Sequence, residues 1–150
     1  MSLESDINQR TFRNQQQKSM VNLIYSYHWV VERIKQFLSD EDITLQQYNI
    51  LRILRGSSPK PLSTMQIRER MLDKMSDTSR IVDRLRLKGL VEKSTAKSDK
   101  RLVDVMITDK GRKLLEKLDA QNERLDHIMH GLNEDDMKVF NDLLDKIRTK

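Results

Sequence analysis

The hydrophobic pattern of this chain changes its period at Gly89, and this change constrains the fold more than any other feature. Across residues 76–88 the apolar side chains recur at helical spacing, and a glycine follows where the end of a helix favours one. Through residues 91–96 and 102–107, apolar and polar residues alternate with the period of a strand. The pattern therefore predicts a helix followed by a β-hairpin.

The residues at the ends of these elements support that prediction. Ser76 is the candidate N-cap of the helix, and Lys97-Ser98-Asp99-Lys100 is rich in residues that favour a turn between the strands. Thr108 is expected to cap a new helix, with Asp109 in its first turn, where a negative charge suits the helix dipole. Residues 75–111 are thus predicted to form a helix, a hairpin and the opening of another helix.

Positive charge is concentrated in the same stretch. The chain has 28 Lys and Arg against 23 Asp and Glu, a net charge of +5. From Arg80 to Arg101 there are eight basic and three acidic residues, which also gives +5, so the rest of the chain is neutral. A solvated face needs no such segregation, whereas a surface that meets a polyanion does. The charge pattern therefore favours double-stranded DNA as a partner.

The side chains of this stretch suit the two grooves of DNA. Short hydroxyls and guanidinium groups on one side of the 76–88 helix suit base edges and phosphates in a major groove. The charged hairpin tip suits a minor groove, where we expect Asp99 to hold Arg101 in position by a charge-assisted hydrogen bond. The start of a preceding short helix is expected near phosphate. The predicted DNA-binding residues are Ser63, Thr64, Ser76, Asp77, Ser79, Arg80, Arg84, Lys97, Asp99, Lys100 and Arg101.

Four motifs carry a resemblance to a known family. They are Arg80-Ile81-Val82-Asp83-Arg84-Leu85, Lys88-Gly89-Leu90-Val91, Asp99-Lys100-Arg101 and Ile107-Thr108-Asp109-Lys110-Gly111. In order and spacing they resemble the signature of the MarR (multiple antibiotic resistance regulator) family, and the resemblance extends over essentially the whole chain. It implies a mainly α-helical winged helix-turn-helix protein with a small β-hairpin wing. Such a homodimer binds a pseudo-palindromic operator, usually as a repressor that a small ligand or an oxidant releases.

The composition favours one mainly α-helical domain spanning residues 1–150. The chain is 37% hydrophobic and 34% charged, with only four Gly and two Pro. No apolar run approaches the roughly 20 residues that cross a membrane, and the N-terminus is polar rather than a signal sequence. The sequence therefore predicts a cytoplasmic protein without a membrane partner.

The side-chain inventory favours binding over catalysis. The chain has no cysteine, which excludes disulfides, thiolate zinc sites and the thiol-based peroxide sensing of some members of the resembled family. There is no nucleophile paired with a base and no cofactor fingerprint, so neither an enzyme nor a cofactor is predicted. Glu123, His127 and His130 share a spacing that could hold a metal, but such sets arise easily on a solvated helix. No metal site is predicted.

Amphipathic segments flank the central stretch. One helix is predicted from about Ile7 to Leu38, with an apolar stripe that must be buried. A second is predicted from Asp109 to His130 with a break around Gly131, and Asn133 is expected to cap the last helix. These stripes suit an intertwined dimer, and packing within one chain is the alternative.

The resemblance divides the domain into two functional parts. Residues 1–40 and 112–150 would form the dimerisation helices, and residues 44–111 would form the winged-helix DNA-binding lobe. Within that lobe, capping boxes of Thr44 with Gln47 and of Ser63 with Gln66 predict the starts of two helices, with a loop at residues 57–61 between them.

A group of aromatic residues suggests a small-molecule pocket. In the resembled family such pockets lie between the dimer helices and the DNA-binding lobe. The candidate lining residues are Tyr25, His28, Trp29 and Tyr48, and the effector would be a small aromatic or anionic molecule. Ordinary core packing is the competing interpretation of these aromatics.

Two other functions compete with DNA binding. A winged-helix domain could use the same surface to bind a protein partner without specific DNA binding. The charged hairpin tip argues against this alternative because it fits a narrow minor groove. Binding to an anionic membrane would need a basic amphipathic helix with large apolar residues on its other face, whereas part of the charge here lies on a hairpin.

Overall fold

Most of the chain is helical, and a small antiparallel sheet completes one end. The computed structural model describes residues 1–149. The helices are α1 (Leu3–Asp6), α2 (Gln15–Leu38), α3 (Leu45–Ser57), α4 (Thr64–Arg70), α5 (Thr78–Leu87), α6 (Asp109–Asp119), α7 (Asn122–Asp126) and α8 (Glu134–Ile147), with 3-10 turns η1 (Ser39–Glu41) and η2 (His127–Met129). The strands are β1 (Leu62–Ser63), β2 (Val91–Thr95) and β3 (Val103–Ile107).

Side-chain caps set the starts of the helices, as the sequence predicts. The Thr44 hydroxyl accepts from the Gln47 amide, and the Gln47 side chain accepts from the Thr44 amide, both at 3.1 Å. Ser63 and Gln66 form the same capping box at the start of α4. Thr108 caps α6, and Asn133 caps α8. Four predicted helix starts are therefore confirmed.

The cap of α5 differs from the prediction. Asp77, and not Ser76, is the N-cap, because its carboxylate accepts from the Arg80 amide at 3.2 Å. The Ser76 hydroxyl is buried and has no hydrogen-bond partner in the described residues. The cap and the start of the helix therefore lie one residue later than predicted, and the helix begins at Thr78.

Two other helix boundaries were predicted wrongly. The long N-terminal helix starts at Gln15 and not near Ile7, because the Asn14 side chain caps it and α1 is a separate short helix. The predicted helix from Asp109 to His130 is broken at Ala120 and Gln121. Both residues are good helix formers, so the break reflects tertiary context rather than local preference.

Contacts on either side of the break tie the two segments to different parts of the molecule. Before the break, Asp119 of α6 pairs with Arg55 of α3 at 2.5 Å. After it, the Arg124 guanidinium of α7 lies 5.4 Å from the centre of the Phe37 ring on α2. The chain thus changes from packing on the lobe to packing on the long helix.

The predicted hairpin is confirmed, and a short third strand joins it. The sheet order is β1-β3-β2, with both pairs antiparallel. Val91 pairs with Ile107 at the base of the hairpin, and Leu62 of β1 pairs with Val105. With two residues, β1 is too short to show an alternating pattern, so the sequence did not predict it.

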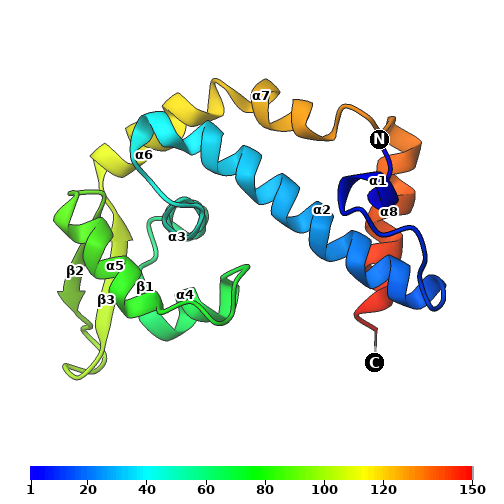
Figure 1. The fold of residues 1–150 in the computed structure, drawn as a ribbon. Coiled ribbons are helices and arrows are strands. Elements are labelled where there is room, and N and C mark those ends of the chain that lie inside the picture. Colours follow the sequence, from blue (N-terminus) through cyan, green and yellow to red (C-terminus); the bar gives the residue numbers. More distant parts are fainter. Residues whose placement is uncertain (150) are drawn as a thin grey trace.

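The hydrophobic core lies in the lobe made by α3 to α6 and the sheet (Figure 1). Helix α2 contributes fully buried residues only at its C-terminal end, Phe37 and Leu38, and α8 contributes none. Figure 1 shows α1, α8 and the start of α2 together at the far end of α2 from the lobe, where both termini also lie. No helix in residues 1–149 is long and apolar enough to span a membrane.

Candidate nucleic-acid interface

Helix α5 exposes polar side chains along one side and buries apolar ones along the other. Val82 and Leu85 are fully buried in the lobe core. Ser79, Arg80 and Arg84 are exposed, as a surface that contacts DNA requires. Arg80 and Arg84 are four residues apart and therefore neighbours on the helix surface.

The hairpin tip is organised by one ion pair. Asp99 accepts from the backbone amide of Arg101 at 2.9 Å and from its Nε and Nη2 at 3.2 and 3.1 Å. These hydrogen bonds hold the pKa of the Asp99 carboxyl below its usual range. The bonds from the Arg101 side chain have the larger effect, and the bond from its backbone amide has the smaller one. The Leu102 amide donates to the Asp99 carbonyl at 3.0 Å, so the turn lies at residues 99–102, two residues later than predicted.

Ion pairing leaves much of the positive charge of this surface free. Lys93 pairs with Asp83 at 2.8 Å, which lowers the pKa of the Asp83 carboxyl, and Lys88 pairs with Asp42 at 3.8 Å. With Arg101 bound to Asp99, three of the eight basic residues are paired. Those with no ion pair among residues 1–149 are Arg80, Arg84, Arg86, Lys97 and Lys100.

Two of the predicted DNA contacts, Ser63 and Asp77, have structural tasks as helix caps. The Ser63 hydroxyl accepts from the Gln66 amide at 3.2 Å as the N-cap of α4, where Thr64 is the first residue. The Ser76 hydroxyl is buried beside the start of α5. Asp77 is exposed, but its carboxylate caps that helix. These residues shape the surface around α5 more than they offer free groups to a ligand.

The base of the hairpin is anchored by two hydrogen bonds that the sequence did not predict. The Thr108 hydroxyl donates to the Gly89 carbonyl at 2.7 Å, and the Lys110 amine donates to the Lys88 carbonyl at 2.9 Å. Gly89 has a φ of 73°, a left-handed conformation that favours glycine. At Gly111 the backbone packs so closely on Leu90 that a side chain would overlap it. The geometry of the wing base therefore needs both glycines.

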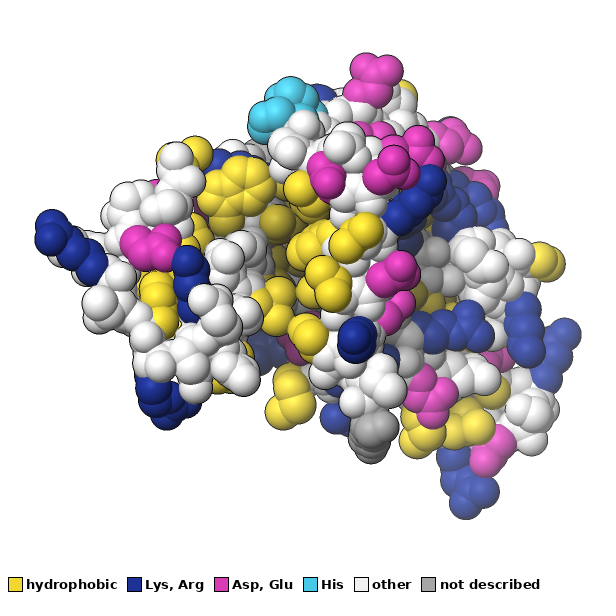
Figure 2. All heavy atoms as spheres, turned by 90° about the vertical axis from the view of Figure 1, so that its right-hand side faces the viewer, with side chains coloured by type: hydrophobic (Ala, Val, Ile, Leu, Met, Phe, Trp, Pro, Cys, Tyr) yellow, Lys and Arg dark blue, Asp and Glu magenta, His cyan; other side chains and the backbone are white. Residues whose placement is uncertain are grey.

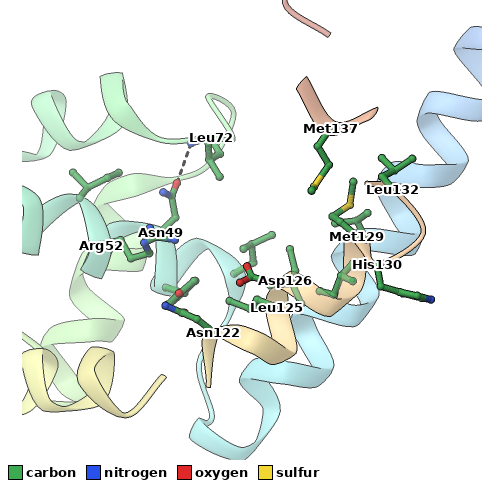
Figure 3. Close-up of a pocket in the computed structure, with 16 residues that line it drawn as sticks. Asn49, Arg52, Leu72, Asn122, Leu125, Asp126, Met129, His130, Leu132 and Met137 are labelled. Atoms are coloured by element: carbon green, nitrogen blue, oxygen red, sulfur yellow. Dashed lines mark hydrogen bonds between the residues drawn. The ribbon is translucent and has the colours of Figure 1, made fainter. Parts of the chain in front are cut away.

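A cavity of about 1120 Å³ lies between α2, α3 and the α7–η2 segment (Figure 3). Its lining is mainly apolar, and its polar residues include Asn49, Arg52, Asn122 and Asp126. Of the predicted pocket residues, Tyr48 lines this cavity. The sequence pattern did not single out Asn49 or Arg52, because neither stands out from other polar residues of an amphipathic helix.

The other predicted pocket residues lie elsewhere on α2. The Arg33 guanidinium lies over the Trp29 ring, with its Cζ 3.3 Å from the ring centre. Tyr25 and His28 are exposed, and His28 instead meets the Tyr27 ring edge-on at 5.2 Å. The structure therefore does not bring Tyr25, His28 and Trp29 together with Tyr48 around this cavity. Their positions follow the opposite side of α2, which the lobe does not reach.

The histidines near the end of α7 do not assemble a metal-binding group. His127 and His130 stack with their ring centres 4.4 Å apart, and His130 Nδ1 lies 2.8 Å from the His127 carbonyl oxygen. In the described part of the chain, no three His, Cys, Asp or Glu side chains, Glu123 included, are placed to share a metal ion. The 3-10 turn at residues 127–129 replaces the regular helix that the spacing assumed.

A broad apolar surface lies away from the DNA-suited face. Figure 2, which looks onto the end of the molecule that holds α1 and α8, shows hydrophobic side chains gathered in the middle of that face. The exposed large hydrophobic residues on α2 and α8 are Met20, Leu23, Ile24, Tyr25, Tyr27, Val139, Phe140, Leu143 and Ile147. The N-terminal half of the predicted apolar stripe of α2 is thus left uncovered by its own chain.

Sequence and structure comparisons agree on one group of proteins. A model of the MarR family matches residues 41–102. The curated HTH-type transcriptional regulator FarR from Neisseria gonorrhoeae is 27% identical over 125 residues, which cover 83% of this chain and 84% of that protein. A crystal structure of a MarR transcription factor from Planctomyces limnophilus is 28% identical, with a TM-score of 0.68, and covers 90% of this chain and 98% of that one.

Two further structures share the fold at lower identity. A mutant MarR from E. coli, solved in complex with operator DNA, is 22% identical with a TM-score of 0.79 and covers 99% of this chain and 100% of its own. BpsR from Bordetella bronchiseptica, whose DNA binding is regulated by 6-hydroxynicotinic acid, is 23% identical with a TM-score of 0.77. The latter match covers 88% of this chain and 99% of that one.

Proposed function

We propose that this chain, as a member of the MarR family of transcriptional regulators, binds a pseudo-palindromic operator as a homodimer. We also propose that it acts as a repressor that a small ligand releases. The family consists of regulators and not enzymes. We further propose that the chain itself has no catalytic activity and works in the cytoplasm.

The observation that carries the proposal is the position of unpaired cations on two neighbouring elements. Arg80 and Arg84 are exposed on α5, and Lys97 and Lys100 are exposed at the hairpin tip. A helix and a charged hairpin on one lobe match the two grooves of a duplex, since the helix fits a major groove and the hairpin a minor groove. A protein-binding module would not need cations on both elements.

The terminal helices support the dimer. Helix α8 buries no residue within its own chain, yet Phe140 and Leu143 lie exposed along it beside the uncovered stripe of α2. Monomeric proteins rarely leave such contiguous apolar surface in water. A second copy would cover these residues and bring two lobes to two half-sites of one operator.

A salt titration with one variant tests phosphate contact at the hairpin tip. For a duplex selected by the protein, log Kd against log salt should have a slope near 0.9 for each phosphate neutralised. Because Lys97 is unpaired and exposed, Lys97→Ala should make the slope shallower by about one to two units per dimer. It should weaken binding to unrelated DNA as well.

Two controls make that titration specific. Lys35→Ala removes an exposed lysine from α2, outside the lobe, and should leave the slope unchanged. Arg80→Ala should instead reduce the preference for the selected duplex, by roughly 1 to 3 kcal/mol if its guanidinium makes a bidentate base contact. Equal slopes for Lys97→Ala and the unmodified protein would contradict phosphate contact at the tip.

Asp99→Ala tests the positioning of Arg101. Removing a negative charge should by itself strengthen DNA binding, but the carboxylate also fixes Arg101 through three hydrogen bonds. We expect binding to weaken about threefold to tenfold, because the arginine then samples many conformations. Asp104→Ala is the matched control, since Asp104 lies on the same hairpin without an ion pair in residues 1–149. Tighter binding by both variants would show that Asp99 has no positioning role.

The cavity between α2, α3 and α7 is the proposed effector site. Its apolar lining with Arg52 and Asn49 at one side suits a small aromatic or anionic molecule. BpsR, which shares the fold, is regulated by 6-hydroxynicotinic acid, an aromatic acid. Because the chain has no cysteine, we propose that its regulation does not use thiol oxidation.

A further inference from the structure

We infer that Asn49, on the wall of this cavity, positions the start of α5, so that one hydrogen bond connects the cavity to the proposed DNA-reading helix. Asn49 Oδ1 accepts from the Leu72 amide at 2.9 Å (Figure 3). Asn49 belongs to α3, whereas Leu72 opens the loop that leads from α4 to α5. This inference rests on the proposed function, because its consequence is a change in DNA binding.

Between Met71 and Thr78, which are both buried, little else holds this loop to the rest of the lobe. Its apolar side chains are largely exposed, Leu72 to 81% and Met75 to 89%. Its other hydrogen bonds are local: Asp73 accepts from the Met75 and Ser76 amides, and the Lys74 amine donates to the Glu69 carbonyl. Apart from that Lys74 bond to the neighbouring end of α4, the Asn49 bond is the one hydrogen bond among the described residues that ties residues 72–76 to another element.

The start of α5 has few polar ties of its own. The hydroxyls of Ser76 and Thr78 are buried without a hydrogen-bond partner in the described residues. The first turn is therefore held by packing and by the Asp77 cap, which is internal to the helix. A shift of the loop would move this turn, and with it Ser79 and Arg80, without breaking another polar contact to the lobe.

The cavity gives access to the same acceptor atom. Asn49 and Leu72 both line it, beside Arg52 and the α7 residues Asn122 and Asp126 (Figure 3). A molecule in the cavity that carries a hydroxyl or N–H group competes with the Leu72 amide for Asn49 Oδ1. The loop then loses its tie to α3, and α5 loses its fixed start. This geometry assigns hydrogen-bond donors as the chemical class of effector that weakens DNA binding.

Substitutions at Asn49 test the positioning role. Asn49→Ala removes the acceptor and should raise Kd for a duplex selected by the unmodified protein about tenfold, the typical effect of one lost hydrogen bond. The salt slope should stay unchanged, because no phosphate contact is removed. Asn49→Asp keeps an acceptor of the same shape and should bind within about threefold of the unmodified protein. Gln46→Ala removes another side-chain amide from α3, at a residue that does not line the cavity, and should leave Kd unchanged.

Hydrogen exchange separates failure of this inference from failure of DNA binding. The Leu72 amide should exchange faster in Asn49→Ala and remain protected in Asn49→Asp, whether or not any duplex binds. Unchanged exchange in Asn49→Ala overturns the positioning role, as does Asn49→Asp binding DNA as weakly as Asn49→Ala. If the unmodified protein binds no duplex, the proposed function fails, and the exchange result alone decides whether Asn49 holds the loop.

A single introduced cysteine tests transmission from the cavity. Arg52 lies three residues beyond Asn49 on α3, so their side chains are neighbours, and the chain has no cysteine of its own. Arg52→Cys treated with iodoacetamide gains an amide N–H donor beside Asn49, whereas methyl methanethiosulfonate adds a methylthio group without one. The amide adduct should bind the duplex at least about threefold more weakly than the methylthio adduct.

The same adducts in an Asn49→Ala background complete the cycle. There the two adducts should bind DNA equally, because the acceptor for which the amide competes is absent. An equal difference between the adducts in both backgrounds would overturn transmission through Asn49. Equal binding by both adducts in the presence of Asn49 would also overturn it.

Discussion

Gly111→Ala should lower the free energy of unfolding by about 3 kcal/mol, because the added methyl group has no room. A Cβ at this position would overlap the Leu90 carbonyl oxygen and lie 2.7 Å from Ile107 Cγ1. The first of these contacts is backbone and cannot rotate away. Urea unfolding at a fixed protein concentration measures the loss, and the melting temperature should fall by roughly 9 °C for a chain of this size.

Gly56→Ala is the matched control for this prediction. Gly56 is exposed within α3, and a Cβ there would meet nothing within 4 Å. Because alanine has the higher helix propensity, this variant should be more stable by up to about 1 kcal/mol. Equal destabilisation by the two substitutions would show that close packing at the wing base is not what requires Gly111.

Leu143→Asp should dissociate the proposed dimer. Leu143 is 54% exposed on α8 in the single chain, although it lies within the apolar surface of the terminal helices. A two-fold interface loses this leucine twice, at about 2 kcal/mol for each side chain, and places two carboxylates near each other. The dissociation constant should therefore rise at least about a thousandfold, which sedimentation velocity over a range of concentrations measures.

Leu87→Asp is the control for the dimer. Leu87 is 83% exposed at the end of α5, away from the terminal helices. Its substitution is the same chemical change as Leu143→Asp. It should leave the oligomeric state unchanged. A stable dimer of Leu143→Asp, or a monomer of the unmodified protein at micromolar concentration, would contradict the assignment of these helices to the interface.

The parts of the fold that the sequence predicted depend on local chemistry. The hairpin strands follow from alternation around Gly89, and four helix starts follow from side chains that cap their own helix, such as Thr44 and Asn133. The Asp99–Arg101 contact also spans only two residues. Such features are encoded in neighbouring residues, so the rest of the molecule does not change them.

The features that the sequence did not predict depend on distant contacts. Ser76 and Asp77 are both good N-caps by residue type, and in the structure Asp77 caps the helix while the Ser76 hydroxyl is buried. The Asn49–Leu72 bond joins residues 23 positions apart, and no periodic pattern marks it. Trp29 was expected in a pocket, but the neighbouring Arg33 on its own helix covers the ring.

Selection of duplexes from a random pool by the protein most directly tests specific DNA binding by a dimer. We expect enrichment of one pseudo-palindromic sequence, with two half-sites whose centres lie about one helical turn apart. Two copies of α5 would read those half-sites, joined by the terminal helices. A pool that shows no enriched sequence would contradict specific DNA binding and would favour a winged-helix module that binds a protein partner.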